Sequence, residues 1–403
     1  MGKRRRVSGS ARVSHAPAAA RKAAAEEVDD VESAWGARLA ALSSVDLEGY
    51  EARLRRLVGR GGGGGEEGES GGAAEKLALH LVQEGRAAEA RAVMSGMGCE
   101  WRLADCVLRY QTTPRGEEDR EQGGVDAEAE HGRWVRAVDG ALPGAMVARL
   151  AKCFGKESAF WREHRYGVDG GGADYFSYAH RLGPSGGDDG TGMGQILAWI
   201  HAEVVCALWP GAGRARYAEW WAHCRPHACG HQLHFDSDDE GRGGVRNPIC
   251  SIVVYLSESP VGGPTLVTTQ TLGSRGLARQ GWLVHPVQNR VCVFDGHVLH
   301  GVIPGRGVGP GGRRVTLMVA FWEDLVMRDP DAQVPCASQP FPKEGGFTWP
   351  RMLEREPDGY GPRADGGEVR PVALPRVWEA VDDPSREVPA DPMPPYAQCF
   401  QGF

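Results

Sequence analysis

The chain has no apolar run long enough to cross a membrane. Its longest apolar stretches, such as residues 249–256, fall far short of the ~20 residues that a membrane helix needs. No apolar signal segment opens the sequence, and its ten cysteines are scattered over 403 residues. Disulfide frameworks belong mainly to short secreted chains, so we expect an intracellular, soluble protein with unpaired thiols and no membrane partner.

The sequence also has no excess of positive charge. Lys and Arg number 46 against 53 Asp and Glu, which gives a formal net charge of −7. This balance argues against a general nucleic-acid binder, but not against a local basic patch. Hydrophobic residues at 41% and charged residues at 25% are ordinary for globular proteins, which excludes fibrous and wholly disordered chains.

Acidic residues are absent from the first 25 positions, where seven Lys and Arg are mixed with Ser and Ala. This composition predicts a disordered basic tail over residues 1–31. The same composition fits a nuclear localisation signal or an organellar transit peptide. Nuclear, organellar and cytosolic locations therefore all stay open.

Residues 32–114 show the helical spacing of apolar side chains, for example at Tyr50, Leu54 and Leu57. Glycine dominates residues 59–72, which predicts a flexible linker that interrupts this helical region.

Short apolar runs separated by Gly, Pro and Asn dominate residues 132–330, which predicts an all-β sandwich or barrel with a few supporting helices. Residues 331–403 are rich in Pro and carry aromatic side chains that predict an extension packed on the core. We expect a chain beginning near Gly132 to fold and bind metal by itself. The competing expectation is that helices within 73–110 pack on this domain and complete its core.

Potential metal ligands gather in residues 223–236. Side chains two positions apart in a strand point to the same face, so His234 and Asp236 are expected to project together into the barrel. One imidazole and one carboxylate are two thirds of the 2-His-1-carboxylate set that binds non-haem Fe(II). The third ligand must come from a distant strand.

An apolar strand over 291–294 leads to two further histidines, His297 and His300. His300 is the favoured ligand because it runs into Gly301 and a turn that re-enters the sheet, and His297 is the alternative. Spacing alone does not decide between them.

Arg314 and Thr316 share one face of the next apolar strand. A buried guanidinium needs an anion, and a carboxylate is its natural bidentate partner. The Thr316 hydroxyl would donate to the same anion. Arg313 lies beside Arg314 and is the alternative cation.

A structural zinc site is the second hypothesis for the segment 223–231. Its candidate ligands are His223, Cys224, His227, Cys229 and His231. The segment lacks a clean C-x-x-C pair, which weakens this interpretation.

The ordered set His234-x-Asp236, His300 and Arg314-x-Thr316 resembles the Fe(II)/2-oxoglutarate-dependent dioxygenase superfamily. The surrounding sequence is similar to its prolyl-hydroxylase-like branch. The resembling segments are Asn247-Pro248, Tyr255-Leu256, Gly262-Gly263-Pro264-Thr265, Pro286, 291–294 and 313–322. The resemblance covers roughly residues 135–322, about half of the chain.

The resemblance implies an α+β chain built on a double-stranded β-helix, or jelly roll, with supporting helices. It implies that His234, Asp236 and His300 hold Fe(II), and that Arg314 binds the distal carboxylate of 2-oxoglutarate. Thr316 and Tyr255 would help to bind that carboxylate.

The implied reaction hydroxylates a substrate with O2 and releases succinate and CO2, with ascorbate as a reductant. A protein side chain or a small molecule is the favoured substrate, and nucleic acid is not indicated. The alternative is a non-catalytic metal-binding or interaction module on the same scaffold.

The sequence departs from the family in the strand before the first ligand. The usual tyrosine and glycine are replaced by Trp220-Trp221-Ala222-His223-Cys224. The group that orients the metal-bound end of 2-oxoglutarate is therefore unassigned. Tyr178 is one candidate, although an aromatic strand is more often core.

Overall fold

The computed structural model describes most of the chain from Leu47 onward. The described residues are 47–60, 67–112, 132–166, 176–183, 190–238, 245–258, 260–307, 312–325, 338–342, 346–363 and 366–402. The predicted basic tail, residues 32–46 and the acidic segment around 115–131 lie outside them.

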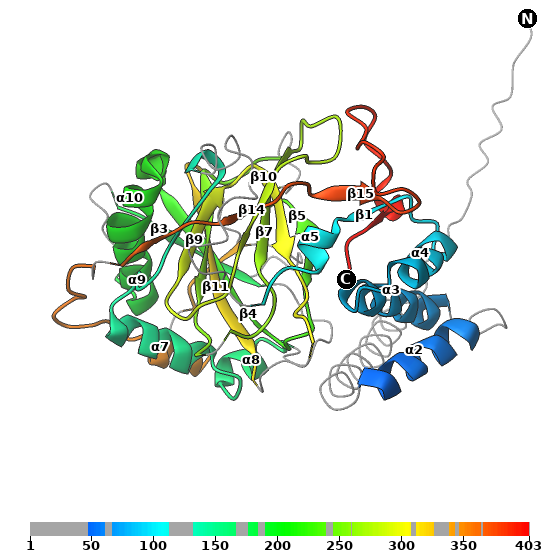
Figure 1. The fold of residues 1–403 in the computed structure, drawn as a ribbon. Coiled ribbons are helices and arrows are strands. Elements are labelled where there is room, and N and C mark those ends of the chain that lie inside the picture. Colours follow the sequence, from blue (N-terminus) through cyan, green and yellow to red (C-terminus); the bar gives the residue numbers. More distant parts are fainter. Residues whose placement is uncertain are drawn as a thin grey trace, which may run out of the picture.

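Two facing sheets form the centre of the molecule (Figure 1). The central strands of the larger sheet run in the order β4 (Tyr217–Arg225), β11 (Arg314–Trp322), β6 (Cys250–Tyr255) and β9 (Val291–Asp295). The smaller sheet has the order β8 (Gly281–Val284), β7 (Thr265–Thr271), β10 (Val298–Val302) and β5 (His231–His234).

These eight strands alternate between the sheets as the chain proceeds. β4, β6, β9 and β11 lie in the larger sheet, and β5, β7, β8 and β10 lie in the smaller one. The pairs among these eight strands are antiparallel. This winding defines a double-stranded β-helix, so the fold predicted from the sequence is confirmed.

Shorter strands extend both sheets. They are β12 (Ser338–Pro340), β3 (Ser177–Arg181), β2 (Val135–Val138) and β13 (Glu368–Val369) in the larger sheet, and β14 (Val372–Ala373) in the smaller one.

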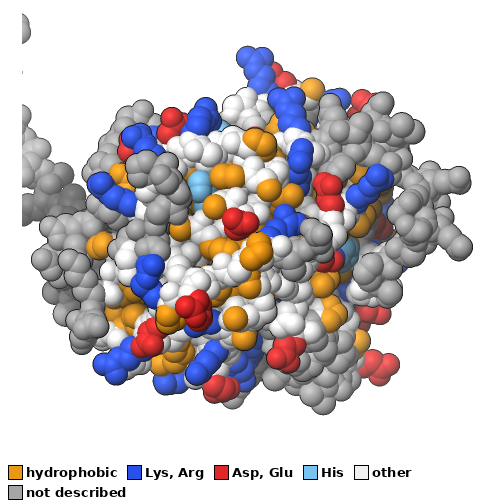
Figure 2. Space-filling model, turned by 90° about the vertical axis from the view of Figure 1, so that its left-hand side faces the viewer, with side chains coloured by type: hydrophobic (Ala, Val, Ile, Leu, Met, Phe, Trp, Pro, Cys, Tyr) orange, Lys and Arg blue, Asp and Glu red, His pale blue; other side chains and the backbone are white. Residues whose placement is uncertain are grey.

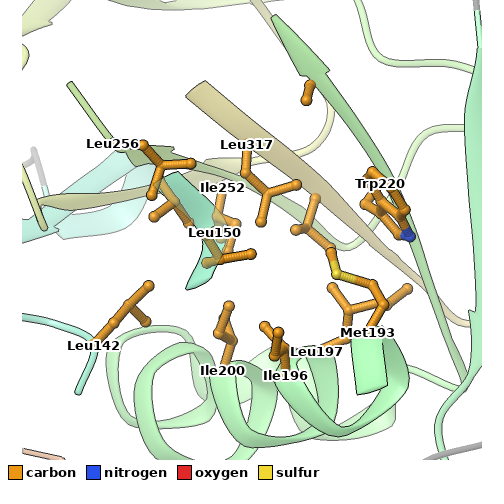
Figure 3. Close-up of a cluster of buried hydrophobic side chains, with 14 of the residues drawn as sticks. Leu142, Leu150, Met193, Ile196, Leu197, Ile200, Trp220, Ile252, Leu256 and Leu317 are labelled. Atoms are coloured by element: carbon orange, nitrogen blue, oxygen red, sulfur yellow. The ribbon is translucent and has the colours of Figure 1, made fainter. Parts of the chain in front are cut away.

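Helices cover the outer face of the larger sheet. They are α7 (Gly144–Phe154), α8 (Ala159–Glu163), and α9 (Gly192–Ile200), which continues through η3 (His201–Val205) and α10 (Cys206–Leu208). Figure 3 shows Leu150, Ile196 and Ile200 from these helices directed at Ile252 and Leu317 of the sheet. All five side chains are fully buried, and each contributes ~1.5–3 kcal/mol by leaving water. This core fixes the larger sheet from behind.

The C-terminal extension joins the same core. Trp349, in η5 (Trp349–Leu353), is fully buried and packs edge-on against Phe160 and Trp220. The other short turns of helix are η4 (Pro210–Arg214) and η6 (Tyr396–Gln398).

The N-terminal helices lie on the opposite side of the molecule (Figure 1). They are α2 (Leu47–Arg60), α3 (Glu67–Gln83), α4 (Ala87–Gly96) and α5 (Asp105–Leu108). A small sheet joins this region to the C-terminal chain, with β1 (Trp101–Leu103) between β15 (Trp378–Ala380) and β16 (Cys399–Phe400).

One buried cluster unites these helices with the outer face of the smaller sheet. Leu77 and Leu81 of α3 belong to the same cluster as Leu233, Leu266 and Leu299 of β5, β7 and β10. The packing favours the competing expectation, in which the helices complete the core, and argues against a domain that begins near Gly132. The reason is that the smaller sheet is apolar on both faces and needs a cover.

The glycine-rich segment is more helical than its composition predicts. α2 ends at Arg60 and α3 begins at Glu67, so both ends of the predicted linker 59–72 are helical. The fully buried side chains of Ala73 and Leu77 anchor α3, and this packing outweighs the low helix propensity of glycine. Residues 61–66 lie outside the described part.

Among the described helices, none combines the length and apolar composition that a membrane crossing requires. The face in Figure 2 mixes cationic, anionic and apolar side chains over its visible surface.

The nine cysteines in the described part of the chain are all free thiols, as expected.

Candidate active site

Two strands of the smaller sheet bring the predicted ligands together. His234 ends β5, and His300 lies directly opposite it on β10. Asp236 follows His234 by two residues, and its Oδ1 lies 3.6 Å from His234 Nε2 and 3.7 Å from His300 Nε2. The ligand atoms of all three residues lie within 4.8 Å of one another. They form the one such group among the described His, Cys, Asp and Glu side chains.

Backbone carbonyls orient both imidazoles. His234 Nδ1 lies 2.9 Å from the Gln232 carbonyl oxygen, and His300 Nδ1 lies 3.1 Å from that of Val298. A carbonyl can only accept, so each Nδ1 carries the proton and each Nε2 keeps a free lone pair for a metal.

Neighbouring polar groups orient the carboxylate. Asp236 Oδ2 accepts a 2.6 Å hydrogen bond from Ser251 Oγ, and the Asp236 carbonyl accepts one of 2.8 Å from Asn247 Nδ2. The Ser251 bond leaves Oδ1 directed at the two imidazoles. The donor set, two neutral nitrogens and one carboxylate oxygen with their partners in place, therefore fits a divalent transition metal.

The ionisation states suit metal binding. Burial raises the pKa of Asp236, but the nearby His300 and His234 and the Ser251 hydroxyl lower it by more, so the pKa falls below its ordinary value. Burial lowers the pKa of His300 to about 4. Burial also lowers the pKa of His234, and the adjacent Asp236 carboxylate more than reverses this, leaving the pKa raised. Near neutral pH the site holds one anion and an already neutral His300.

His297 does not join this group. Its side chain is 57% exposed, and its Nδ1 lies 2.8 Å from Asp295 Oδ1 at the β9–β10 turn. The structure therefore places His300, and not His297, beside His234 and Asp236.

Arg314 lies at the first position of β11 and is 4% exposed. Its Nη2 donates to Thr265 Oγ1 over 3.3 Å, and its guanidinium carbon lies 5.4 Å from the Tyr255 ring centre. The Tyr255 hydroxyl lies 2.7 Å from the same Thr265 oxygen and donates to the Val284 carbonyl over 3.2 Å. Arg314, Thr265 and Tyr255 thus form one contiguous polar group.

No carboxylate among the described residues pairs with Arg314. Its Nε and the neighbouring Thr316 Oγ1 are both buried without a hydrogen-bond partner there. Burial lowers the pKa of Arg314, which measures the cost of holding this cation out of water. A buried cation with unused donors calls for an anionic ligand.

Two consecutive glycines allow close packing beside Arg314, the first against its side chain and the second against the backbone of Ile303. Gly262 has φ +82°, and a Cβ there would overlap the Arg314 side chain. A Cβ on Gly263 would overlap the backbone of Ile303. The Gly-Gly-Pro-Thr segment therefore lets the chain pass close to the arginine and delivers Thr265 to it.

A pocket between the sheets connects the triad with Arg314. Its volume is about 580 Å³ counted out to its open mouth. Trp221, Phe294 and Met318 line its apolar part, and Thr265, Ser251 and His223 are among its polar lining residues. The pocket can therefore hold an elongated ligand with one end at the triad and an anionic end at Arg314.

The zinc hypothesis for 223–231 is not supported. Cys224 is fully buried in the core behind the larger sheet, whereas His223 lines the pocket, because neighbouring residues of a strand face opposite sides. His227 Nδ1 accepts from the Gly262 backbone N–H over 3.0 Å, and its Nε2 lies 3.1 Å from the Arg306 carbonyl. These side chains do not converge on one point.

Tyr178 also lies away from the pocket. Its hydroxyl is 2.8 Å from His164 Nε2, and its ring packs in the core behind the larger sheet. The sequence did not indicate the roles of Ser251 and Thr265. Thr265 stands in the recognised Gly-Gly-Pro-Thr segment and Ser251 in none of the recognised segments, and the contacts of both depend on cross-strand register.

No protein-family model matches the chain, and no curated protein is detectably similar to it in sequence. Similar solved structures include a prolyl-4-hydroxylase from Pseudomonas putida, at 20% identity, 49% coverage of this chain, 90% of that chain and a TM-score of 0.29. HygX from Streptomyces hygroscopicus, with nickel and 2-oxoglutarate bound, has 13% identity, coverages of 53% and 94%, and a TM-score of 0.28.

A 2OG-Fe(II) oxygenase family oxidoreductase from Burkholderia pseudomallei has 13% identity, coverages of 51% and 92%, and a TM-score of 0.29. The structural neighbours are thus 2-oxoglutarate/Fe(II) oxygenases that overlap about half of the chain. At this level of similarity, the chemistry of the chain has to be argued from its own side chains.

Proposed function

We propose that the protein is an Fe(II)- and 2-oxoglutarate-dependent dioxygenase that hydroxylates a substrate and releases succinate and CO2. One observation carries the proposal. Two imidazoles and one carboxylate converge in a pocket, and the same pocket is lined by a buried arginine that has no carboxylate partner among the described residues. A facial set of three ligands leaves positions open for a chelating cosubstrate and O2.

In this proposal His234, Asp236 and His300 hold Fe(II), which with 2-oxoglutarate and O2 supplies the oxidising chemistry. Arg314 binds the distal carboxylate of 2-oxoglutarate through charge-assisted hydrogen bonds. Thr265 and Tyr255 hold the guanidinium in place, and the Thr316 hydroxyl is available to the same carboxylate.

The chain also controls access to the centre. The side chains of Trp221, Phe294 and Met318 exclude water from the space beside the metal ligands, which protects a reactive centre from side reactions. We infer a protein side chain or a small molecule as the substrate, with ascorbate as the reductant that keeps the metal ferrous. The basic composition of residues 1–25 fits a nuclear or organellar location as well as a cytosolic one.

The test loads the purified full chain with Fe(II) without oxygen, then measures bound iron and succinate formed from 2-oxoglutarate after oxygen is admitted. We expect one iron per chain and slow succinate formation without added substrate. Asp236→Ala removes the only anionic ligand and should lose both iron and turnover. A wild-type chain that bound no iron, or an Asp236→Ala chain that kept both properties, would contradict the proposal.

The second candidate is a non-catalytic binding module on the same scaffold. It predicts metal binding without succinate formation under the same conditions. The buried, unneutralised Arg314 argues against it, because an arginine without a ligand costs stability.

A further inference from the structure

His223 on β4 lines the pocket without belonging to the proposed metal ligands. It lines the same pocket as the triad, and its Nε2 is buried without a hydrogen-bond partner among the described residues. Leaving a buried nitrogen without a partner is unfavourable, so it marks a place where a ligand completes the hydrogen bonding.

Tyr166 fixes which nitrogen of His223 carries the proton. The Tyr166 hydroxyl oxygen lies 2.8 Å from His223 Nδ1. Burial raises the pKa of Tyr166 to about 12, whereas Arg225 and the Cys224 backbone lower it, as groups that present donors to the hydroxyl oxygen do. The guanidinium carbon of Arg225 lies 5.1 Å from the Tyr166 ring centre. With donors on this side of the oxygen, the hydroxyl directs its own proton at His223 Nδ1.

The consequence is a buried hydrogen-bond donor on a residue that lines the pocket. Burial, followed by the neighbouring His231 and Arg225, lowers the pKa of His223 well below its ordinary value, so the ring is neutral. A neutral imidazole that accepts at Nδ1 carries its single proton at Nε2. His223 Nε2–H is therefore an unused donor.

The strand register places this donor between the two ends of the pocket. His223 is paired with Thr316 across β4 and β11, two residues from Arg314 in the direction of Ala320. Ala320 is paired with Ser251, which holds Asp236. On its other side His223 lies 5.1 Å, between ring centres, from His231, which stacks on His234 at 4.6 Å.

We propose that His223, oriented by Tyr166, is a positioning residue that donates Nε2–H to the carboxylate of 2-oxoglutarate nearer the metal. This inference rests on the proposed function and fills the position that the departure in the segment 220–224 left unassigned. The distal carboxylate belongs to Arg314, so the two ends of the cosubstrate have separate donors.

The test measures 2-oxoglutarate affinity of the full, Mn(II)-loaded chain by calorimetry. His223→Phe keeps a flat ring and removes the donor, and His223→Gln supplies an amide N–H in its place. We expect His223→Phe to weaken 2-oxoglutarate at least roughly tenfold, with Mn(II) affinity unchanged and partial recovery in His223→Gln. Unchanged 2-oxoglutarate affinity in His223→Phe would overturn the inference alone. Absence of 2-oxoglutarate binding in the wild type would overturn the proposed function with it.

A matched pair of tyrosine variants tests the relay. Tyr166→Phe and Tyr178→Phe each remove one buried hydroxyl that lies 2.8 Å from a histidine ring, but only Tyr166 adjoins the pocket histidine. Nitrogen NMR of histidine-labelled protein should show Nε2–H at His223 in the wild type and in Tyr178→Phe. It should show a changed tautomer balance and weaker 2-oxoglutarate binding in Tyr166→Phe. Equal behaviour of the two variants would overturn the relay.

A double variant tests which carboxylate His223 contacts. Donors to separate carboxylates should act independently. The fold-losses in 2-oxoglutarate affinity caused by His223→Phe and Arg314→Lys should therefore multiply in the double variant. A deviation beyond roughly threefold would place both residues on one carboxylate and overturn the assignment of ends.

Discussion

His234 and His300 face each other across the β5–β10 pair, and both direct Nε2 toward the same oxygen, Asp236 Oδ1, at 3.6 and 3.7 Å. Each ring is held from behind by a backbone carbonyl two residues before it in the sequence. The same contact between a ring and a carbonyl therefore occurs in both strands, and the β5–β10 pairing brings the two Nε2 atoms close to one carboxylate oxygen.

Replacement of His300 should abolish metal binding, and replacement of His297 should not. His300→Ala removes one of three ligand atoms, whereas His297→Ala removes an exposed ring that touches Asp295. Iron content and succinate formation of the two variants provide the measurement. Loss of iron from His297→Ala with retention in His300→Ala would move the ligand to His297.

Replacement of Arg314 should separate cosubstrate binding from metal binding. A charge-assisted bidentate contact is worth about 1.5–3 kcal/mol, so Arg314→Ala should raise the KM for 2-oxoglutarate at least roughly tenfold while iron stays bound. Arg313→Ala, beside it in the sequence, is the control and should change the KM little. Equal effects of the two replacements would reassign the anion site.

Gly262 should be intolerant of a side chain. Gly262→Ala places a Cβ against Arg314 at a positive φ, so both overlap and backbone strain act, and we expect a loss of about 2–4 kcal/mol in unfolding free energy. Gly307→Ala has a positive φ of 67° but open space around its Cβ, and it should cost only about 1 kcal/mol. Urea unfolding of both variants measures the difference, and equal losses would show that the fit to Arg314 is unimportant.

The sequence predicts the metal ligands better than their surroundings. His234 and Asp236 follow from the two-residue period of a strand. The apolar strand over 291–294 leads to both His297 and His300, and the structure places only His300 beside the other two. Ser251 and Thr265 lie on other strands, and their contacts depend on a register that no local pattern specifies. Neighbouring side chains of β4 point to opposite faces of the sheet, so His223 and Cys224 lie on different sides of it. The ligand-rich composition of this segment does not reveal the separation.

The role of the N-terminal helices likewise depends on long-range packing. Their apolar faces are visible in the sequence, but the partner surface is the outer face of β5, β7 and β10. The strands that carry this partner surface also supply the pocket, so each is apolar on both sides. The packing therefore does not agree with the expectation that residues from about 132 onward fold without the N-terminal helices.

Removal of the helices should therefore destabilise the remaining protein. A chain beginning at Gly132 would expose Leu233, Leu266 and Leu299 and lose the hydrogen bond from the Tyr110 hydroxyl to the Pro304 carbonyl. We expect poor solubility and weak metal binding, whereas limited proteolysis of the full chain should leave the helices attached to the jelly roll. A soluble, metal-binding fragment that begins near Gly132 would show that the two parts are independent.

The most direct measurement of the central claim is a crystal structure of the full chain with Mn(II) and an inert 2-oxoglutarate analogue. The account predicts one ion bonded to His234 Nε2, Asp236 Oδ1 and His300 Nε2, with the distal carboxylate of the analogue on Arg314. An ion bound elsewhere, for example at Cys229 or His227, or an analogue that left Arg314 without an anion, would contradict it.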